Sequence, residues 1–298
     1  MKVANIGSPL ESRVFQTNDI SLHVVLAGPA NGKPLIFLHG FPEFWFAWRA
    51  QIDHFVSLGY RVIIPDQRGY NLSDKPSGIV NYSIDLLAAD IVGLVDKVAA
   101  SKAFIVGHDV GGAVTWYLLA RYPDRFTRAA ILGAPHFRVF LKNLVTNPAQ
   151  MRKSWYVFFF QFPWLPEILL RRKDWKLLLR VLRNTVPAGV FSDSDLELYR
   201  ESWSKAGSLT AMLNWYRAVL LHSSKLKLDA EASRAKVPLL LVWGKKDSFT
   251  GLTMARESLA YCDAGFLEII DTATHWVQHE HPARFNTVVS QFFASGSR

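Results

Sequence analysis

The sequence predicts an α/β protein with a mostly parallel sheet, helices on both faces and a helical unit inserted into it. In the first third of the 298-residue chain, short β-branched runs alternate with longer amphipathic stretches. The strand-like runs stop after Pro135 and begin again at Val237. Such strand–helix alternation is typical of parallel strands joined by crossover helices.

Four buried strands are predicted before the interruption, and amphipathic helices lie between them. Asn81 and Ser83 can cap the start of the second helix, and another helix follows Gly112. The predicted strands are 34–40, 61–69, 102–109 and 128–135, and the predicted helices are 45–57 and 82–100.

The middle of the chain differs from both ends in pattern and charge. Residues 138–230 show helical periodicity with many Trp and Phe, and carry 15 Lys/Arg against 7 Asp/Glu, which is nearly all of the net charge of +9. Strands 237–247 and 265–275 and a closing helix 281–295 then follow. We therefore predict a core of residues 1–135 and 235–298, with a helical cap at 136–234.

Composition excludes several classes of protein. Cys262 is the only cysteine, which rules out an internal disulfide framework or a Cys-cluster metal site. No signal-peptide core or membrane-length apolar run is present, so a cytoplasmic protein is expected. No nucleic-acid motif accompanies the basic middle third, so we expect no nucleic-acid partner.

A nucleophile-elbow pattern follows the third predicted strand. Gly107-His108-Asp109-Val110-Gly111-Gly112 leads from that strand into a helix. Gly107 and Gly111 relieve crowding around a strained residue that projects into the cavity. That residue is Asp109, where serine is the usual occupant. A dinucleotide-binding turn is the alternative, but the glycine spacing is wrong and the carboxylate would repel a pyrophosphate.

Two more residues at strand ends complete a candidate triad. Asp247 ends the stretch 237–247, and His275 ends the stretch 265–275. The order Asp109, Asp247, His275 is the nucleophile–acid–histidine order of α/β-hydrolases. No acid occurs in 132–137, the other strand end where an orienting carboxylate could lie.

Nearly the whole chain resembles the α/β-hydrolase-fold epoxide hydrolases. The motifs are His39-Gly40-Phe41-Pro42, Asp66-Gln67-Arg68-Gly69-Tyr70, the elbow, Leu213-Asn214-Trp215-Tyr216-Arg217 and His275. The resemblance implies an α/β-hydrolase core with an inserted cap, and an oxyanion hole formed by the backbone N–H groups of Phe41 and Val110. It also implies neither a cofactor nor a metal. The structural interpretation of the His39-Gly40-Phe41-Pro42 motif is a tight turn, for which a cis Phe41–Pro42 bond is one form, and both interpretations can hold together. His108, Asp66 and Arg68 are interpreted as structural.

An aspartate nucleophile determines the expected chemistry. A carboxylate can attack a saturated carbon and form an alkyl ester, which a water activated by His275 then hydrolyses while Asp247 orients the imidazole. The resemblance implies two cap tyrosines that hold and protonate the epoxide oxygen. Tyr216 and Tyr156 match these positions, and Tyr199 is the substitute for Tyr156.

The expected partners are a small apolar epoxide and water. The aromatic run 155–164 is expected to be mostly core and interface, with some side chains lining the pocket. The basic residues after it favour a solvated helix face over an anionic membrane surface. Three alternatives stay open: a haloalkane or haloacid dehalogenase, a non-catalytic ligand receptor, and a membrane-associated interaction module, which would require vesicle binding through the basic cap. Val110 and Ala113 replace the two arginines of fluoroacetate dehalogenases, and no oligomeric state is predicted.

Overall fold

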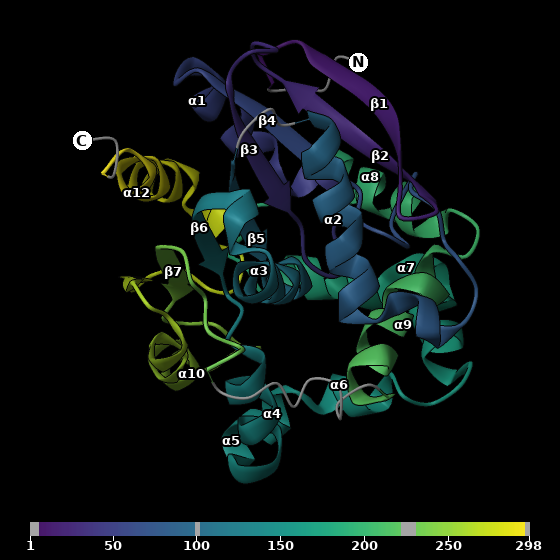
Figure 1. The fold of residues 1–298 in the computed structure, drawn as a ribbon. Coiled ribbons are helices and arrows are strands. Elements are labelled where there is room, and N and C mark those ends of the chain that lie inside the picture. Colours follow the sequence, from purple (N-terminus) through teal and green to yellow (C-terminus); the bar gives the residue numbers. More distant parts are fainter. Residues whose placement is uncertain (1–5, 99–101, 222–230, 296–298) are drawn as a thin grey trace.

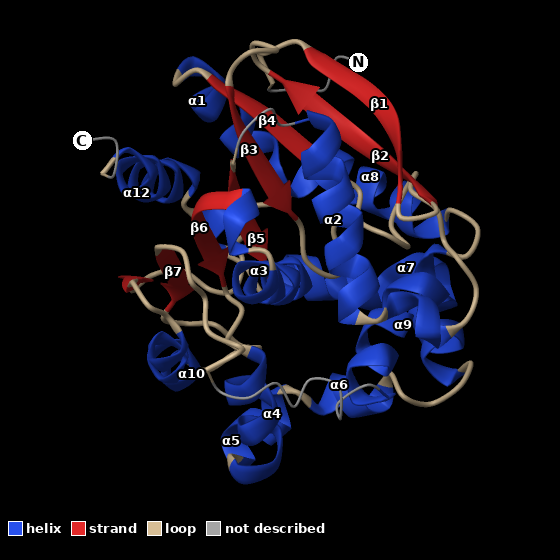
Figure 2. Cartoon of the chain, in the orientation of Figure 1, coloured by secondary structure: helices blue, strands red, loops and turns tan. Residues whose placement is uncertain are grey.

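An eight-stranded sheet forms the centre of the molecule (Figure 1; Figure 2). The computed structural model describes residues 6–98, 102–221 and 231–295. The strand order is β1-β2-β4-β3-β5-β6-β7-β8, and all pairs from β4 to β8 are parallel. The strands are β1 (Leu10–Thr17), β2 (Ile20–Ala27), β3 (Lys33–Leu38), β4 (Tyr60–Pro65), β5 (Ala103–His108), β6 (Phe126–Leu132), β7 (Leu239–Gly244) and β8 (Gly265–Ile270).

The six parallel strands confirm the predicted α/β class. Each lies within or next to a predicted strand, and the central ones are buried along their whole length. Strands that are covered on both faces consist of continuous apolar runs, which explains why the sequence pattern located them.

The N-terminal hairpin was not predicted. β1 and β2 pair antiparallel, and β2 pairs antiparallel with β4. The turn consists of Asn18 and Asp19, both with positive φ (46° and 60°), a conformation that Asn and Asp tolerate better than most residues. β1 is largely exposed, so it lacks the apolar run that marks the other strands.

Helices pack beside the sheet in two groups. α1 contacts α12 on one side, and α2 contacts α3 on the other (Figure 1). Ser83 directly precedes α2, as expected, and its carbonyl accepts the first backbone hydrogen bonds of that helix. These helices are α1 (Arg49–Ser57), α2 (Ile84–Val98), α3 (Asp109–Arg121), α10 (Leu252–Ser258), α11 (Val277–Glu280) and α12 (Pro282–Ala294).

Between β6 and β7 the described residues form helices and no strand. They are α4 (Phe137–Thr146), α5 (Pro148–Lys153), α6 (Trp155–Phe159), α7 (Leu165–Asn184), α8 (Asp193–Ser204) and α9 (Ser208–Leu221). The indole N–H of Trp203 in α8 donates to the Pro42 carbonyl at 2.6 Å, and that of Trp215 in α9 donates to the Arg68 carbonyl at 2.9 Å. These helices are thereby fastened to the loops that follow β3 and β4. Residues 222–230 of the predicted cap and residues 99–100 of a predicted helix lie outside the described residues.

The aromatic run differs from its expected burial. Phe160 is buried, but Trp155, Phe158, Phe162 and Trp164 are exposed, with Trp164 at 77%. α6 is only five residues long, and α7 is interrupted by non-helical backbone at 172–175. Short, bent helices cannot bury every bulky side chain of a continuous aromatic run. No helix among the described residues is both long and apolar enough to cross a membrane.

Candidate active site

Asp109 lies at a sharp turn between β5 and α3. Its φ is +51°, a strained value for a residue with a side chain. A Cβ on Gly107 would lie 2.6 Å from the Gly111 carbonyl oxygen, and one on Gly111 would lie 2.5 Å from the His39 carbonyl oxygen. Only glycine fits at both positions, so the spacing of the elbow motif follows from the close approach of these backbones.

The Asp109 carboxylate has two different neighbours. The Phe41 backbone N–H donates to Oδ1 at 3.1 Å. His275 Nε2 lies 3.6 Å from Oδ2. The Phe41–Pro42 peptide bond is cis, as the sequence indicated. One oxygen is therefore held by a backbone donor, and the other faces the histidine and the cavity.

His275 is oriented by Asp247 from the loop after β7. His275 Nδ1 lies 2.8 Å from Asp247 Oδ2, and the backbone N–H groups of Phe249 and Thr250 donate to Asp247 Oδ1 at 2.7 and 2.8 Å. The Thr250 hydroxyl donates to Oδ2 at 2.8 Å. Because Asp247 is buried and its oxygens are occupied, the imidazole is held in one orientation.

The three groups alter one another's protonation. Burial alone would lower the pKa of His275, but the charges and hydrogen bonds of Asp247 and Asp109 raise it to about 10. Burial alone would raise the pKa of each carboxyl, but His275 outweighs it, so the pKa values of Asp109 and Asp247 both lie below their ordinary values. At neutral pH the site therefore contains an imidazolium between two carboxylates.

Tyr156 in α6 and Tyr216 in α9 face the same space as Asp109. Their ring centroids are 6.0 Å apart. Burial, reinforced by the charge of Asp109, raises the pKa of each phenol well above its ordinary value. Neither hydroxyl has a hydrogen-bonding partner among the residues that the structure describes. Two protonated donors are thus available to a bound molecule.

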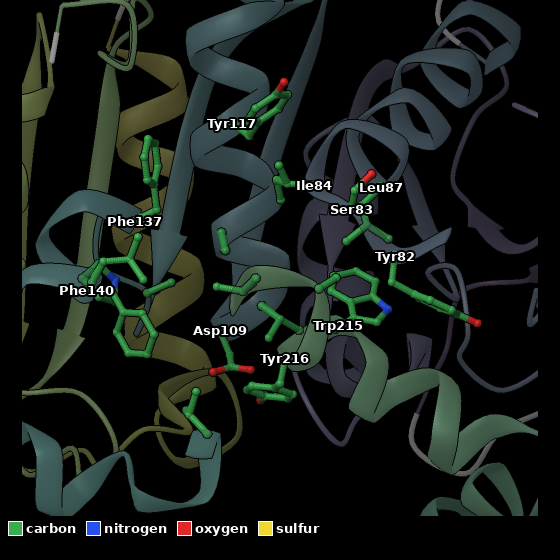
Figure 3. A pocket seen from close by; sticks show the side chains of 18 of the residues that line it. Tyr82, Ser83, Ile84, Leu87, Asp109, Tyr117, Phe137, Phe140, Trp215 and Tyr216 are labelled. Atoms are coloured by element: carbon green, nitrogen blue, oxygen red, sulfur yellow. The ribbon is translucent and has the colours of Figure 1, made fainter. Parts of the chain in front are cut away.

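Two cavities meet at this group. Asp109, Tyr156 and Tyr216 line both of them. Figure 3 shows the first cavity, in which Asp109 and Tyr216 lie next to each other and apolar side chains such as Phe137 and Phe140 surround the remaining space. The second cavity lies on the side of His275 and Phe249. The Asp109 carboxylate thus lies at a junction of two mainly apolar spaces.

Of the other residues predicted from the sequence, Val110 lies at the first cavity and Tyr199 does not. Val110 lines the first cavity. It is in the first turn of α3, and backbone N–H groups in a first turn have no partner within the helix. Tyr199 is outside both cavities, and its hydroxyl donates to Glu43 Oε1 at 2.8 Å. The structure therefore brings Tyr156, rather than its substitute Tyr199, to Asp109.

Comparison with known proteins defines the family. A model of the alpha/beta hydrolase fold matches residues 33–282. AB hydrolase superfamily protein YfhM of Bacillus subtilis is 42% identical over 95% of this chain and 98% of its own length. Epoxide hydrolase 1 of Caenorhabditis elegans is 35% identical over 97% of this chain and 71% of its own length. The chain belongs to the α/β-hydrolase-fold epoxide hydrolase family.

A solved structure of an epoxide hydrolase supports the assignment of this chain to the family. A variant of a Bacillus megaterium epoxide hydrolase, crystallised with its product (R)-3-[1]naphthyloxy-propane-1,2-diol, superposes with a TM-score of 0.86. It is 29% identical, and the match covers 94% of this chain and 99% of that one.

A buried polar network behind His275 of this family member was not predicted. Glu43 accepts hydrogen bonds from Tyr199 and from Gln278 Nε2 at 3.3 Å, and lies 2.6 Å from His279 Nε2. His108 Nδ1 lies 3.2 Å from the same carboxylate, and His108 Nε2 lies 3.2 Å from the His275 carbonyl oxygen. Glu43 directly follows the His-Gly-Phe-Pro motif, which was the available signal. His108 thus supports the segment that carries His275.

Asp66 and Arg68 have the structural contacts expected of them. Asp66 accepts from the Trp45 backbone N–H at 2.9 Å, and Arg68 donates to Asp90 at 2.6 and 2.7 Å. Among the described residues no cluster of His, Cys, Asp and Glu could hold a metal ion.

Proposed function

We propose that this protein is an epoxide hydrolase that converts apolar epoxides to vicinal diols through an alkyl ester on Asp109. One observation carries the proposal. A carboxylate occupies the elbow, and two unpartnered tyrosine hydroxyls face the same cavity space. A carboxylate nucleophile needs no base for its attack, and a leaving alkoxide needs a proton donor. The site supplies both.

In the first step Asp109 Oδ2 attacks an epoxide carbon while the carbon–oxygen bond of the ring breaks. Oδ1 is held by the Phe41 N–H, so Oδ2 is the free oxygen. The electron pair of the broken bond stays on the epoxide oxygen, and Tyr156 or Tyr216 transfers its proton to it. A phenol is well suited to this task, because it is protonated at neutral pH yet more acidic than an alcohol.

In the second step His275 activates water to attack the ester carbon. The oxyanion that forms is stabilised by the N–H groups of Phe41 and Val110. The tetrahedral intermediate collapses to diol and carboxylate: of the two protons of the attacking water, one goes to the departing alkoxide oxygen and the other stays on His275. His275 has by then given its earlier proton to the tyrosinate left by ring opening. In the resting site the pKa of His275 is raised partly by Asp109. Esterification neutralises Asp109, which lowers that pKa and lets His275 lose its proton when a base is needed.

The cap is proposed to comprise residues 136–234 and the hydrolase core residues 1–135 and 235–298. Tyr156 and Tyr216 are on α6 and α9, whereas the triad is on loops after β5, β7 and β8. The acid for ring opening and the nucleophile therefore come from separate parts of the chain.

A single-turnover reaction in ¹⁸O-labelled water tests the covalent step. With enzyme in excess over styrene oxide, the label should appear in the Asp109 peptide by mass spectrometry, and the diol should stay unlabelled. Label appearing in the diol at the first turnover would show direct attack by water and reject the ester.

A substrate panel tests the alternatives. Styrene oxide, an aliphatic epoxide, a haloalkane and fluoroacetate are each incubated with the protein, and diol and halide are measured. Diol formation from the epoxides is expected. Halide release alone would indicate a dehalogenase, and binding without turnover of any compound would indicate a receptor.

A further inference from the structure

A surface of large apolar side chains lies on the segment that forms α6 and the start of α7. Within residues 155–168 the exposed ones are Trp155 (60%), Phe158 (44%), Phe162 (57%), Trp164 (77%), Leu165 (44%) and Ile168 (63%). Isolated exposed apolar residues are ordinary, but a run of this size on one short segment marks an interaction surface.

Basic residues without acidic partners lie in the same segment and directly after it. Residues 151–183 contain eight Lys/Arg and two Asp/Glu. The two acids, Glu167 and Asp174, pair with Arg217 and Arg200 from α9 and α8. Within the described part of the chain, ion-pair partners are lacking for Arg152, Arg171, Arg172, Lys173, Lys176 and Arg180. The positive charge of the segment is therefore uncompensated.

We propose that residues 151–180, the aromatic–basic segment, dock on the surface of an anionic lipid bilayer. Trp and Phe insert at the boundary between headgroups and acyl chains, and Lys and Arg contact anionic headgroups. The segment holds both kinds of side chain, exposed, within 30 residues. The proposal does not depend on the catalytic chemistry.

Charge argues against a second copy of this chain as the occupant. A two-fold contact would bring each aromatic–basic segment against the same positively charged segment of its partner. Like charges facing each other across an interface oppose association. An anionic bilayer complements both the apolar and the basic side chains.

The second cavity opens beside this segment. Arg152, Trp155 and Leu177 line it, and each of the three is exposed. Trp155 also contacts Phe159, which lines the cavity too, with ring centroids 5.7 Å apart. A docked molecule would thus present the mouth of this cavity to the lipid, where apolar epoxides partition.

Co-sedimentation of the full chain with vesicles tests the proposal. The protein should bind vesicles of mixed phosphatidylcholine and phosphatidylglycerol, with little binding to phosphatidylcholine alone and weaker binding at high salt. The variant Phe162→Ser/Trp164→Ser removes exposed aromatic rings, and Arg172→Glu/Lys176→Glu reverses two charges. Each basic residue lost should weaken binding about fivefold, so the charge variant should bind at least about 25-fold more weakly.

Matched controls change similar residues elsewhere. Phe266→Ser removes a 53% exposed ring from β8, and Lys33→Glu/Lys236→Glu reverses two exposed charges. Both should bind vesicles as the parent does. Turnover of a water-soluble epoxide and the melting temperature, measured without lipid, should be unchanged in all four variants, which shows that they fold.

Three results would overturn the proposal. The first is no binding to the anionic vesicles, and the second is equal binding by all variants. The third is a concentration-dependent dimer in sedimentation velocity that Phe162→Ser/Trp164→Ser abolishes while vesicle binding is absent, which would identify a second copy as the occupant.

Discussion

Tyr156 and Tyr216 each place a protonated hydroxyl where the two cavities meet, beside the Asp109 carboxylate. We predict that Tyr156→Phe or Tyr216→Phe slows the alkylation of Asp109 by about 100- to 10,000-fold, the usual contribution of general acid catalysis. The double variant should nearly abolish ring opening, because no donor remains. Stopped-flow single-turnover kinetics separates this step from ester hydrolysis, which should change little.

Tyr199→Phe is the matched control for these variants. Its hydroxyl contacts Glu43 and lies outside both cavities. Alkylation should therefore remain fast. If Tyr199→Phe slowed ring opening and Tyr156→Phe did not, the assignment of the first tyrosine would be wrong.

His275 is expected to act only after the ester has formed. His275→Ala should leave alkylation possible and block hydrolysis, so mass spectrometry of the intact protein should find a substrate adduct on Asp109. Burial without the imidazolium raises the pKa of Asp109, so the experiment is run at pH 8 to 9, where roughly all of the carboxyl is ionised. An inactive variant that binds substrate without forming an adduct would contradict this order of steps.

The two half-reactions should depend differently on pH. In the free enzyme the pKa of His275 is about 10, so alkylation should vary little between pH 6 and 8. In the ester the pKa is lower because Asp109 is neutral, and hydrolysis should accelerate with rising pH as His275 becomes a free base. Single-turnover rates of formation and decay of the ester measure both profiles. An alkylation rate that followed a group of pKa near 7 would contradict the raised pKa of His275.

Sequence reasoning located the triad residues at the strand ends, but it did not locate the buried Glu43 network that supports them. Asp109, Asp247 and His275 follow strands that apolar runs reveal, so their meeting at one edge of the sheet could be expected. Glu43 and His279 gave no such signal. They are brought together with His108 by tertiary packing of η1 (Trp45–Trp48) against α11, and the only local signal is the position of Glu43 directly after the His-Gly-Phe-Pro motif.

At the scale of elements, the Glu43 network joins α8 and α11 to the loop after β3. The Glu43 carboxylate is fully buried, and Tyr199 of α8 and His279 of α11 both contact it. Arg49 extends the network, since Nη1 lies 3.1 Å from His279 Nδ1 and Nη2 lies 3.3 Å from Asp195 in α8. We predict that Glu43→Gln lowers the free energy of unfolding by about 2–4 kcal/mol, measured by urea denaturation.

Lowering the pH should remove the contribution of the Glu43 network to the free energy of unfolding of the unmodified protein. Burial alone would raise the pKa of Glu43, but His279 and His108 outweigh it and hold the pKa below its ordinary value. The ionised form therefore stabilises the fold at neutral pH, and its contribution declines as pH falls below about 4. Asp271→Asn, which alters an exposed pair with Lys245, should cost only about 0–1 kcal/mol. Equal losses in both variants would contradict a structural role of the network.

The central parallel strands were predictable and the first hairpin was not, for one physical reason. Strands covered on both faces must be apolar along their whole length, whereas β1 has one edge without a partner strand and alternates irregularly. For the aromatic run 155–164 the error was the opposite one, since burial was predicted and several of its side chains are exposed. Its composition indicates burial, but α6 and the bent α7 offer too little covered surface. Apolar composition shows that a side chain prefers to be covered, and says nothing of what covers it.

For the molecule as a whole, the two cavities predict tolerance for epoxides substituted on both carbons. One substituent can occupy each cavity while the ring lies at Asp109. Leu141→Trp narrows the first cavity and Leu177→Trp narrows the second. Each should raise KM for a long 1,2-disubstituted epoxide about tenfold, as expected if roughly 50 Å² of apolar contact is lost.

A terminal epoxide with one substituent provides the control for this prediction. It should be sensitive to only one of the two variants, and kcat for a small epoxide such as propylene oxide should be unchanged in both. If both variants left the KM of the long substrate unchanged, the cavities would not be the two arms of one substrate site.

Asp109 and His275 are far apart in the sequence, so they leave the ribosome at different times during synthesis. His275 lies 166 residues beyond Asp109. At a synthesis rate of about 5–20 residues per second, Asp109 emerges roughly 8–33 s before His275. Until then the carboxylate lacks the imidazolium that offsets its burial, and closing the core around it is unfavourable. A chain that ends before residue 275 therefore contains Asp109 without the imidazole that makes its burial favourable, and we expect it not to close its core.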